Sequence, residues 1–305
     1  MISFSKLGNY GRLGNQLFQY AFLRTQAERL GVKFYCPTWE GDSIFNLGDE
    51  GARCAEFVPR TYYEDHSNGY NLDATQIQDG TDIAGFFQSD KYFKKGDVHR
   101  WFSFNESLFV AVNKKYSDIN FSESTGLHVR LGDYTTPQLV FYVPRPEFYK
   151  KALELVDHKR SILVFSDDVV FAKKYLKGIP GNFVYMEKNK GYEDLYLMSK
   201  CRDVVISSSS FSWWAAFLNT YSDKKVVMPA SWFLPGGKTA NNDIFVEGWI
   251  RLRAHRFYDY YYIKYLPNII RVYSGRISKS IDLLRRDGVV SAMNEIKKFV
   301  LKRQR

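Results

Sequence analysis

Three residues that can act on a phosphate group stand within the short segment HVRLGDY, residues 128–134. The guanidinium of Arg130 stays charged and offers forked hydrogen-bond donors to a phosphate. His128 can donate a further hydrogen bond to a diphosphate or to a leaving oxygen. Asp133 can orient Arg130, or it can take a proton from an acceptor hydroxyl as a general base. The alternative is a salt bridge beside a partly buried histidine, and for an isolated R-x-x-D segment this is the commoner outcome.

Two more polar clusters follow apolar runs. Asp167 and Asp168 end the run SILVFSDD, where a carboxylate suits the edge of guanine or a ribose diol. Alternatively, one of them caps the helix expected to follow. The serines of ISSSSFS, Ser207–Ser210 and Ser212, offer hydroxyl and N–H groups at the start of a helix, which makes an anion site. Simple helix capping is the other interpretation, but it needs only one serine.

The turn GRLGNQ places Gly11 and Gly14 directly before an expected helix. Glycine lets a backbone approach a ligand closely, and a helix N-terminus attracts anions. The segment is neither GxGxxG nor a P-loop, so a plain tight turn between a strand and a helix is the alternative.

The elements that must position these residues follow from the apolar pattern. The second half of the chain alternates short apolar runs with helical periods, which is typical of a doubly wound α/β domain. We expect a strand that ends at LHV, 127–129, and strands at 161–168, 182–186, 203–210 and 224–229. The expected helices are 144–157, 170–178, 192–201 and 211–219. In the first half we expect strands at 2–4, 32–37 and 82–89 and an amphipathic helix at 15–30, with helical pieces within 97–118. Ligands of such sheets lie at the carboxyl ends of the strands, so the three polar clusters should converge on one crevice.

Length and composition favour a folded protein with more than one domain. The chain has 305 residues, of which 45% are hydrophobic and 25% charged. We place a boundary near the polar segment NFSESTG, which gives domains at 1–122 and 123–250 and a tail at 251–305. Cys36, Cys54 and Cys201 are too widely spaced to predict a disulfide framework. The five histidines are scattered without HxH or HExxH spacing, so we expect no metal site and no cofactor.

The net charge of +10 lies entirely in the tail. Residues 251–305 hold 14 Lys or Arg and 4 Asp or Glu, which leaves 29 basic and 29 acidic residues in the rest. Within 276–300, apolar residues three, four and seven apart indicate basic amphipathic helices, interrupted at Gly288. Such a tail suits an anionic membrane surface, although packing on the body is an open alternative. We expect a cytoplasmic protein without a membrane span. If the tail binds a membrane, the protein would lie on the inner membrane face.

The segments GRLGNQLFQYAF, HVRLGDY, FSDD and CRDVVISSSSFSWWAAFLN resemble, in this order, the α-1,2-fucosyltransferases of glycosyltransferase family 11. The resemblance covers roughly residues 8–235 and implies a GT-B architecture, in which two Rossmann-like domains face a cleft. The tail adds a basic helical C-terminal extension outside the resemblance. The implied reaction is metal-independent transfer of L-fucose from GDP-β-L-fucose, with inversion, to the 2-OH of galactose in a glycan acceptor. A lipid-linked oligosaccharide of surface polysaccharide or O-antigen synthesis would be such an acceptor.

The resemblance also implies roles for particular residues. His128 and Arg130 would contact the diphosphate, Ser209 and Ser210 would hold phosphate oxygens, and Asp167 or Asp168 would contact guanine or ribose. Gly11, Gly14 and Asn15 would form the loop of the first domain that lies beside the phosphates. From the residues themselves, Asp133 is the candidate base.

Two other functions stay open at this point. Leu131 stands where the family often has a second arginine, so a GT-B transferase with another nucleotide sugar is one alternative. A non-enzymatic protein that binds nucleic acid or an anionic surface is the other, suggested by the isoelectric point of about 9.3. The uncharged body argues against nucleic acid as a partner.

Overall fold

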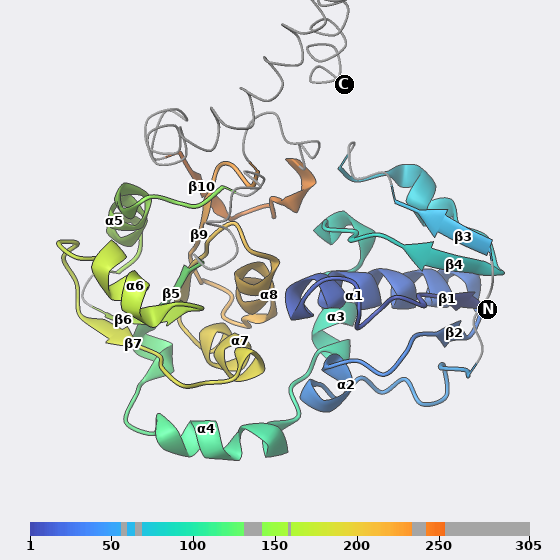
Figure 1. Cartoon of the computed structure of the whole chain (residues 1–305), viewed down its shortest axis with the longest axis horizontal. Helices are drawn as coiled ribbons and strands as arrows, with labels where there is room; N and C mark the ends of the chain where they lie inside the picture. The colour runs from blue at the N-terminus through green and yellow to red at the C-terminus, as the bar shows by residue number, and fades with distance from the viewer. Residues whose placement is uncertain (56–59, 65–68, 131–141, 158–159, 234–241, 254–305) are drawn as a thin grey trace, which may run out of the picture.

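The computed structural model describes residues 1–55, 60–64, 69–130, 142–157, 160–233 and 242–253. Two units, each built on a parallel β-sheet with helices, lie side by side (Figure 1). The long helix of the first unit and a helix of the second lie between the two sheets (Figure 1). This arrangement confirms the α/β class and the GT-B architecture of two Rossmann-like domains.

The first unit contains a four-stranded parallel sheet in the order β2-β1-β4-β3. Its strands are β1 (Ile2–Ser3), β2 (Phe34–Tyr35), β3 (Arg60–Tyr63) and β4 (Thr81–Ala84). β1 and β2 fall within the predicted strands, β4 overlaps the strand predicted at 82–89 but begins at Thr81, and each of the three is shorter than predicted. β3 was not predicted from the sequence; it is an edge strand whose residues are all exposed or half-buried.

Helix α1 (Leu13–Leu30) was predicted as amphipathic, but it is buried on most sides. Its buried residues include Gln16, Gln19, Arg24 and Gln26, because the helix lies between its own sheet and the second unit. Hydrogen bonds compensate part of this burial: the Gln19 side-chain amide donates to the carbonyls of Tyr10 and Gly85 at 2.8 and 3.1 Å. The helix ends at Gly31, which takes the left-handed conformation with φ of 66°.

Short elements complete the first unit and, after β4, lead to the second sheet. The α-helices are α2 (Gly41–Ile44), α3 (Lys95–Trp101) and α4 (Val110–Lys115). The 3-10 turns before the second sheet are η1 (Leu72–Gln76), η2 (Asp90–Tyr92), η3 (Glu106–Phe109) and η4 (Phe121–Glu123). The predicted helical pieces within 97–118 correspond to α3, η3 and α4.

The second unit contains a six-stranded parallel sheet in the order β10-β9-β8-β5-β6-β7. Its strands are β5 (Ser124–Val129), β6 (Ser161–Ser166), β7 (Phe183–Tyr185), β8 (Asp203–Val205), β9 (Val226–Pro229) and β10 (Ile250–Leu252). The helices are α5 (Pro146–Leu155), α6 (Val169–Tyr175), α7 (Gly191–Ser199) and α8 (Ser210–Leu218), with the 3-10 turn η6 (Asn242–Ile244). β6 and β8 end before the predicted limits of 168 and 210, so the aspartates and serines lie in the loops that follow.

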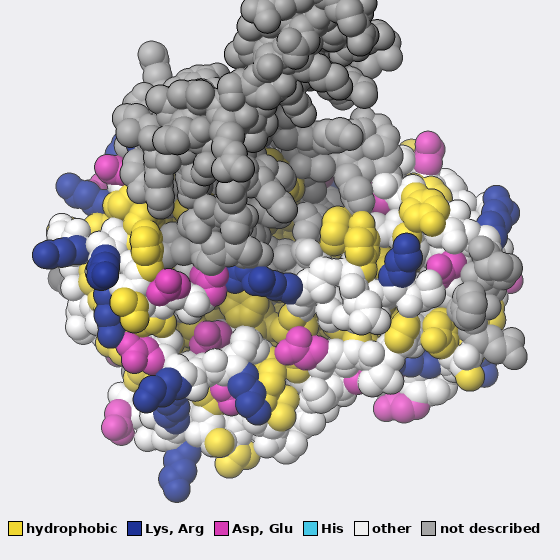
Figure 2. Space-filling model, in the orientation of Figure 1, with side chains coloured by type: hydrophobic (Ala, Val, Ile, Leu, Met, Phe, Trp, Pro, Cys, Tyr) yellow, Lys and Arg dark blue, Asp and Glu magenta, His cyan; other side chains and the backbone are white. Residues whose placement is uncertain are grey.

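The described surface matches the uncharged body inferred from the sequence. On the face in Figure 2, basic and acidic side chains are interspersed over both units. No helix in the described part of the chain is both long and apolar enough to cross a membrane. The second sheet extends to Leu252, and the boundaries near 122 and 250 remain predictions. The predicted tail helices lie in residues 254–305, outside the described residues, so membrane contact also remains a prediction.

Candidate functional site

Neighbouring strands of the second sheet bring the three polar clusters together. β5 pairs with β6 on one side, with Val129 opposite Ser166, and with β8 on the other, with Leu127 opposite Val205. The residues that directly follow these strands therefore leave the same edge of the sheet, because parallel strands end on the same side. Arg130, Asp167 and the serine run all lie at this edge.

Arg130 is paired with Asp167, whose Oδ2 lies 3.1 Å from its Nη1. The two side chains are 13% and 22% exposed, so a ligand can reach them while the protein holds their positions. From the sequence, Asp133 was the residue expected to orient Arg130. Asp133 and Leu131 lie outside the described residues, and within the described part of the chain Asp167 makes this ion pair.

His128, the residue before the last of β5, is held by contacts with the serine run and with α8. Its Nδ1 lies 2.8 Å from the hydroxyl of Ser207, and its ring lies 5.4 Å from that of Phe211. Burial, with a further contribution from the Arg130 charge, lowers the pKa of His128 to about 3. The imidazole is therefore neutral near pH 7 and has one N–H to donate. Ser207 was noticed as part of the serine run, but its contact with His128 was not predicted.

The lowered pKa of His128 predicts a pH dependence of stability. An unfolded histidine takes up a proton near pH 6.5, whereas the folded one resists it until about pH 3. The unfolded state then binds more protons, so this group costs stability as the pH falls from about 6.5 towards 3, by up to about 1.4 kcal/mol per pH unit. We expect His128→Gln to lose less stability than the wild type between neutral and acidic pH in urea unfolding. Parallel pH profiles for the two proteins would contradict a neutral, buried His128.

Each serine of the run 207–210 has a different environment. Ser208 donates to the Ser231 carbonyl at 3.1 Å, and Ser210 donates to the side-chain oxygen of Asn15 at 2.8 Å. Ser209 is the N-cap residue of α8, but its side chain makes no capping hydrogen bond. Simple capping therefore does not explain the run, and the first turn of α8 has no side-chain cap that would compete with an anion.

Asp168 has a structural role. It is the N-cap residue of α6, and its Oδ1 accepts a hydrogen bond of 2.9 Å from the Phe171 N–H. The sequence left helix capping and a place in the ligand site as two interpretations of this pair. Asp168 caps the helix, whereas Asp167 pairs with Arg130 in the candidate site. A contact from either residue to guanine or ribose remains a prediction.

The glycine turn meets the second unit at the start of α8. The Asn15 side-chain oxygen accepts hydrogen bonds from Ser210 and from Gln88, both at 2.8 Å. A Cβ on Gly14 would lie 2.5 Å from the Phe211 nitrogen, so this glycine permits close approach of the chain's own backbone. Gly11, with φ of 89°, has the conformation that glycine adopts most readily. Gln88, beyond β4, was missed because it lay inside the run 82–89 that was predicted to be a strand.

The assembled site is suited to a diphosphate. It combines one guanidinium, one neutral imidazole and the N-terminus of a helix of nine residues, all beside a contact between the two units. Within the described ranges, no three His, Cys, Asp or Glu side chains are arranged to hold a metal ion.

The chain is similar to a known protein family and to several known proteins. The model of a family described as Glycosyl transferase family 11 matches residues 7–253, which include all three clusters. The O-antigen biosynthesis glycosyltransferase WbnK of Escherichia coli is 32% identical over 238 residues, 72% of this chain and 74% of that protein. The alpha-1,2-colitosyltransferase of Escherichia coli is 26% identical over 214 residues, 65% of this chain and 70% of that protein. The crystal structure of POFUT1 with GDP-fucose has a TM-score of 0.49 and 14% identity, over 74% of this chain and 96% of that one.

Proposed function

Because the chain belongs to glycosyl transferase family 11, we propose that it transfers L-fucose from GDP-β-L-fucose to a glycan acceptor. The proposed acceptor group is the 2-OH of a galactose, and the proposed pathway is synthesis of a surface polysaccharide such as an O-antigen. The observation that carries the proposal is the ion pair of Arg130 with Asp167 beside the uncapped start of α8. This cluster of a cation and N–H donors fits a nucleoside diphosphate, which gains negative charge as it leaves the sugar.

Charge development explains why these groups suit the reaction. Cleavage of the bond between the sugar and the phosphate builds positive charge on the sugar ring and negative charge on the departing GDP. Arg130 and the first turn of α8 are fixed before the reaction, so they stabilise this negative charge without reorganising. One such preorganised donor contributes about 3–4 kcal/mol to the rate. Neutralisation by a guanidinium also allows transfer without a metal ion, which is part of the proposal.

His128 can add one hydrogen bond to the leaving group. Its Nδ1 faces Ser207, so the remaining donor is the Nε2–H of the tautomer in which Ser207 donates to Nδ1. This tautomer places the only proton of the neutral ring on the nitrogen that does not face Ser207. In this arrangement His128 binds the diphosphate, and it does not act as the general base.

The acceptor hydroxyl attacks the anomeric carbon from the face opposite the leaving GDP, which inverts the configuration. Asp133 is the proposed base for this hydroxyl, in a segment outside the described residues. The first unit is the proposed acceptor side, where Gly11, Gly14 and Asn15 lead into α1 beside the donor site.

A second donor deserves a direct test, because one relative is named for transfer of colitose. Colitose is L-fucose without its 3-hydroxyl group, so the two GDP-sugars share the nucleotide, the diphosphate and most of the ring. A pocket that hydrogen-bonds the 3-hydroxyl would discriminate between them strongly, since the missing group would leave a buried partner unsatisfied.

Transfer assays with a panel of donors test the proposal. GDP-fucose, GDP-colitose, GDP-mannose and UDP-galactose are each offered with galactose-terminated acceptors in excess EDTA, and the linkage in the product is determined. We expect transfer from GDP-fucose to the 2-OH of galactose, with inversion and without added metal. Transfer from GDP-colitose alone would replace the proposed donor. Transfer from UDP-galactose, or strict dependence on Mg²⁺, would contradict the proposed mechanism.

A further inference from the structure

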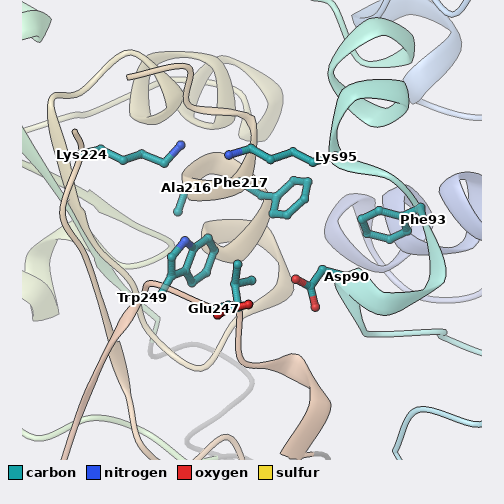
Figure 3. A pocket seen from close by; sticks show the side chains of 9 residues that line it. Asp90, Phe93, Lys95, Ala216, Phe217, Lys224, Glu247 and Trp249 are labelled. Atoms are coloured by element: carbon teal, nitrogen blue, oxygen red, sulfur yellow. The ribbon is translucent and has the colours of Figure 1, made fainter. Parts of the chain in front are cut away.

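A pocket of about 350 Å³ lies at the end of α8 opposite the candidate donor site (Figure 3). The nine residues of α8 separate the two by roughly 12 Å at a rise of about 1.5 Å per residue. Its lining comes from η2, α3, the end of α8, the segment before β9 and the segment before β10, and includes Asp90, Lys95, Phe217, Lys224, Glu247 and Trp249. None of these residues takes part in the donor site described above.

Two lysines face each other across one side of this pocket. The ammonium groups of Lys95 and Lys224 point towards one another (Figure 3). Within the described ranges neither has a carboxylate close enough for an ion pair, although Lys224 donates to the Asn219 carbonyl at the end of α8. Burial and the charge of Lys95 lower the pKa of Lys224 to about 8. Among the described residues, neither ammonium group is therefore neutralised by an ion pair, and an anion placed between them would be attracted by both.

His99 adds a third nitrogen group near the same side. It follows Lys95 by four residues on α3, so the two side chains lie on the same face of that helix. Its Nε2 is buried and has no hydrogen-bond partner among the described residues. Burial, followed by the charges of Lys95 and Lys224, lowers the pKa of His99. One ring nitrogen of His99 is engaged with the Phe217 backbone, so Nε2 of the neutral ring is a hydrogen-bond acceptor. It can accept from a hydroxyl group of a ligand beside the two lysines.

The rest of the pocket has a different chemistry. Asp90 and Glu247 lie at the side away from the lysines, and the rings of Phe217 and Trp249 lie between these two sides (Figure 3). Carboxylates accept hydrogen bonds from hydroxyl groups, and aromatic faces pack on the apolar faces of sugar rings. A small inorganic anion would use only the lysine side, whereas a ring with hydroxyl groups and one anionic group would match all three parts.

We propose that this pocket binds a monosaccharide that carries one oxyanion group, either a phosphate ester or a carboxylate, with the anion between Lys95 and Lys224. Lys95 lies on α3, before the second sheet begins, whereas Lys224 lies between α8 and β9 of the second unit. The ligand therefore links the connecting segment to the second unit, at a place distinct from the donor site. An acidic or phosphorylated sugar of a surface glycan has this chemistry.

Isothermal titration at low ionic strength tests the proposal with four probes: galactose 1-phosphate, galacturonate, galactose and inorganic phosphate. We expect one of the two anionic sugars to bind, and the one that binds identifies the oxyanion. Galactose and inorganic phosphate should each bind at least about tenfold more weakly, because each lacks part of the match. Failure of both anionic sugars to bind at millimolar concentration would overturn the proposal. Equal binding of inorganic phosphate would overturn the assignment of a sugar.

Matched variants locate the binding. Lys95→Met and Lys224→Met should each weaken the anionic sugar at least about tenfold, whereas Lys94→Met, one residue away and outside the pocket, should not. Lys95 is exposed, so its variant is expected to fold even if Lys224→Met, which loses its contact with Asn219, does not. Arg130→Ala should leave this binding unchanged, which separates the pocket from the donor site. Unchanged affinity in Lys95→Met, or its loss in Arg130→Ala, would refute the site.

Discussion

Arg130→Ala is expected to reduce the rate of sugar transfer by about two to three orders of magnitude while the protein stays folded. The guanidinium is held at the end of β5 by Asp167, at 3.1 Å, before any substrate arrives. Loss of one preorganised donor to a developing negative charge costs about 3–4 kcal/mol of transition-state stabilisation. Steady-state kinetics with GDP-fucose, together with circular dichroism and thermal unfolding, measure both parts of this expectation.

Two further variants separate catalysis from structure. Arg130→Ala removes the cation beside Asp167, and an unneutralised carboxylate could itself repel the diphosphate. The double variant with Asp167→Ala removes that repulsion, so recovery of near wild-type turnover would refute a direct role of Arg130. Arg100→Ala is the control, because its pair with Asp97 lies on the surface at 3.1 Å, with the arginine side chain 66% exposed. We expect its activity to match that of the wild type, since exposed ion pairs contribute little.

The sequence predicted the site better than it predicted the contacts within it. Alternating strands and helices implied a parallel sheet, and a parallel sheet brings polar residues after neighbouring strands to one edge. The partner of Arg130 could not be read from the same pattern. Asp133 is three residues away in sequence, whereas Asp167 follows the adjacent strand β6 and meets Arg130 through the pairing of β5 with β6. Register between strands is a long-range property, and local spacing does not encode it.

The two missed strands have a common physical cause. β3 and β10 are edge strands, and both contain exposed or half-buried residues, including Arg60 and Arg251. Strands in the middle of a parallel sheet are covered on both faces and therefore appear as apolar runs, whereas these two exposed edge strands lack such a run. Helix α1 was misjudged for the opposite reason. It is covered on most sides, so its buried glutamines and Arg24 looked like a polar face.

Gly14→Ala is expected to lower the free energy of unfolding by about 2–3 kcal/mol and to impair transfer as well. The added Cβ would lie 2.5 Å from the Phe211 nitrogen and 2.6 Å from the Ser210 carbonyl carbon. Both atoms belong to the backbone at the start of α8, so neither can move without shifting the helix. The same shift would disturb the hydrogen bond from Ser210 to Asn15 and the proposed phosphate site. Urea unfolding and transfer kinetics measure the two effects.

Gly96→Ala is a closely matched control for this prediction. Gly14 and Gly96 are each the second residue of a helix, α1 and α3, but a Cβ on Gly96 would meet nothing within 4 Å. Helix propensity alone favours alanine over glycine by up to about 1 kcal/mol in a helix interior, so it predicts the same sign at both positions. If Gly14→Ala lowers the free energy of unfolding while Gly96→Ala leaves it unchanged or raises it, the close approach of α1 and α8 decides the outcome. If Gly14→Ala were as stable and active as Gly96→Ala, the contact between these two helices would not be as tight as described.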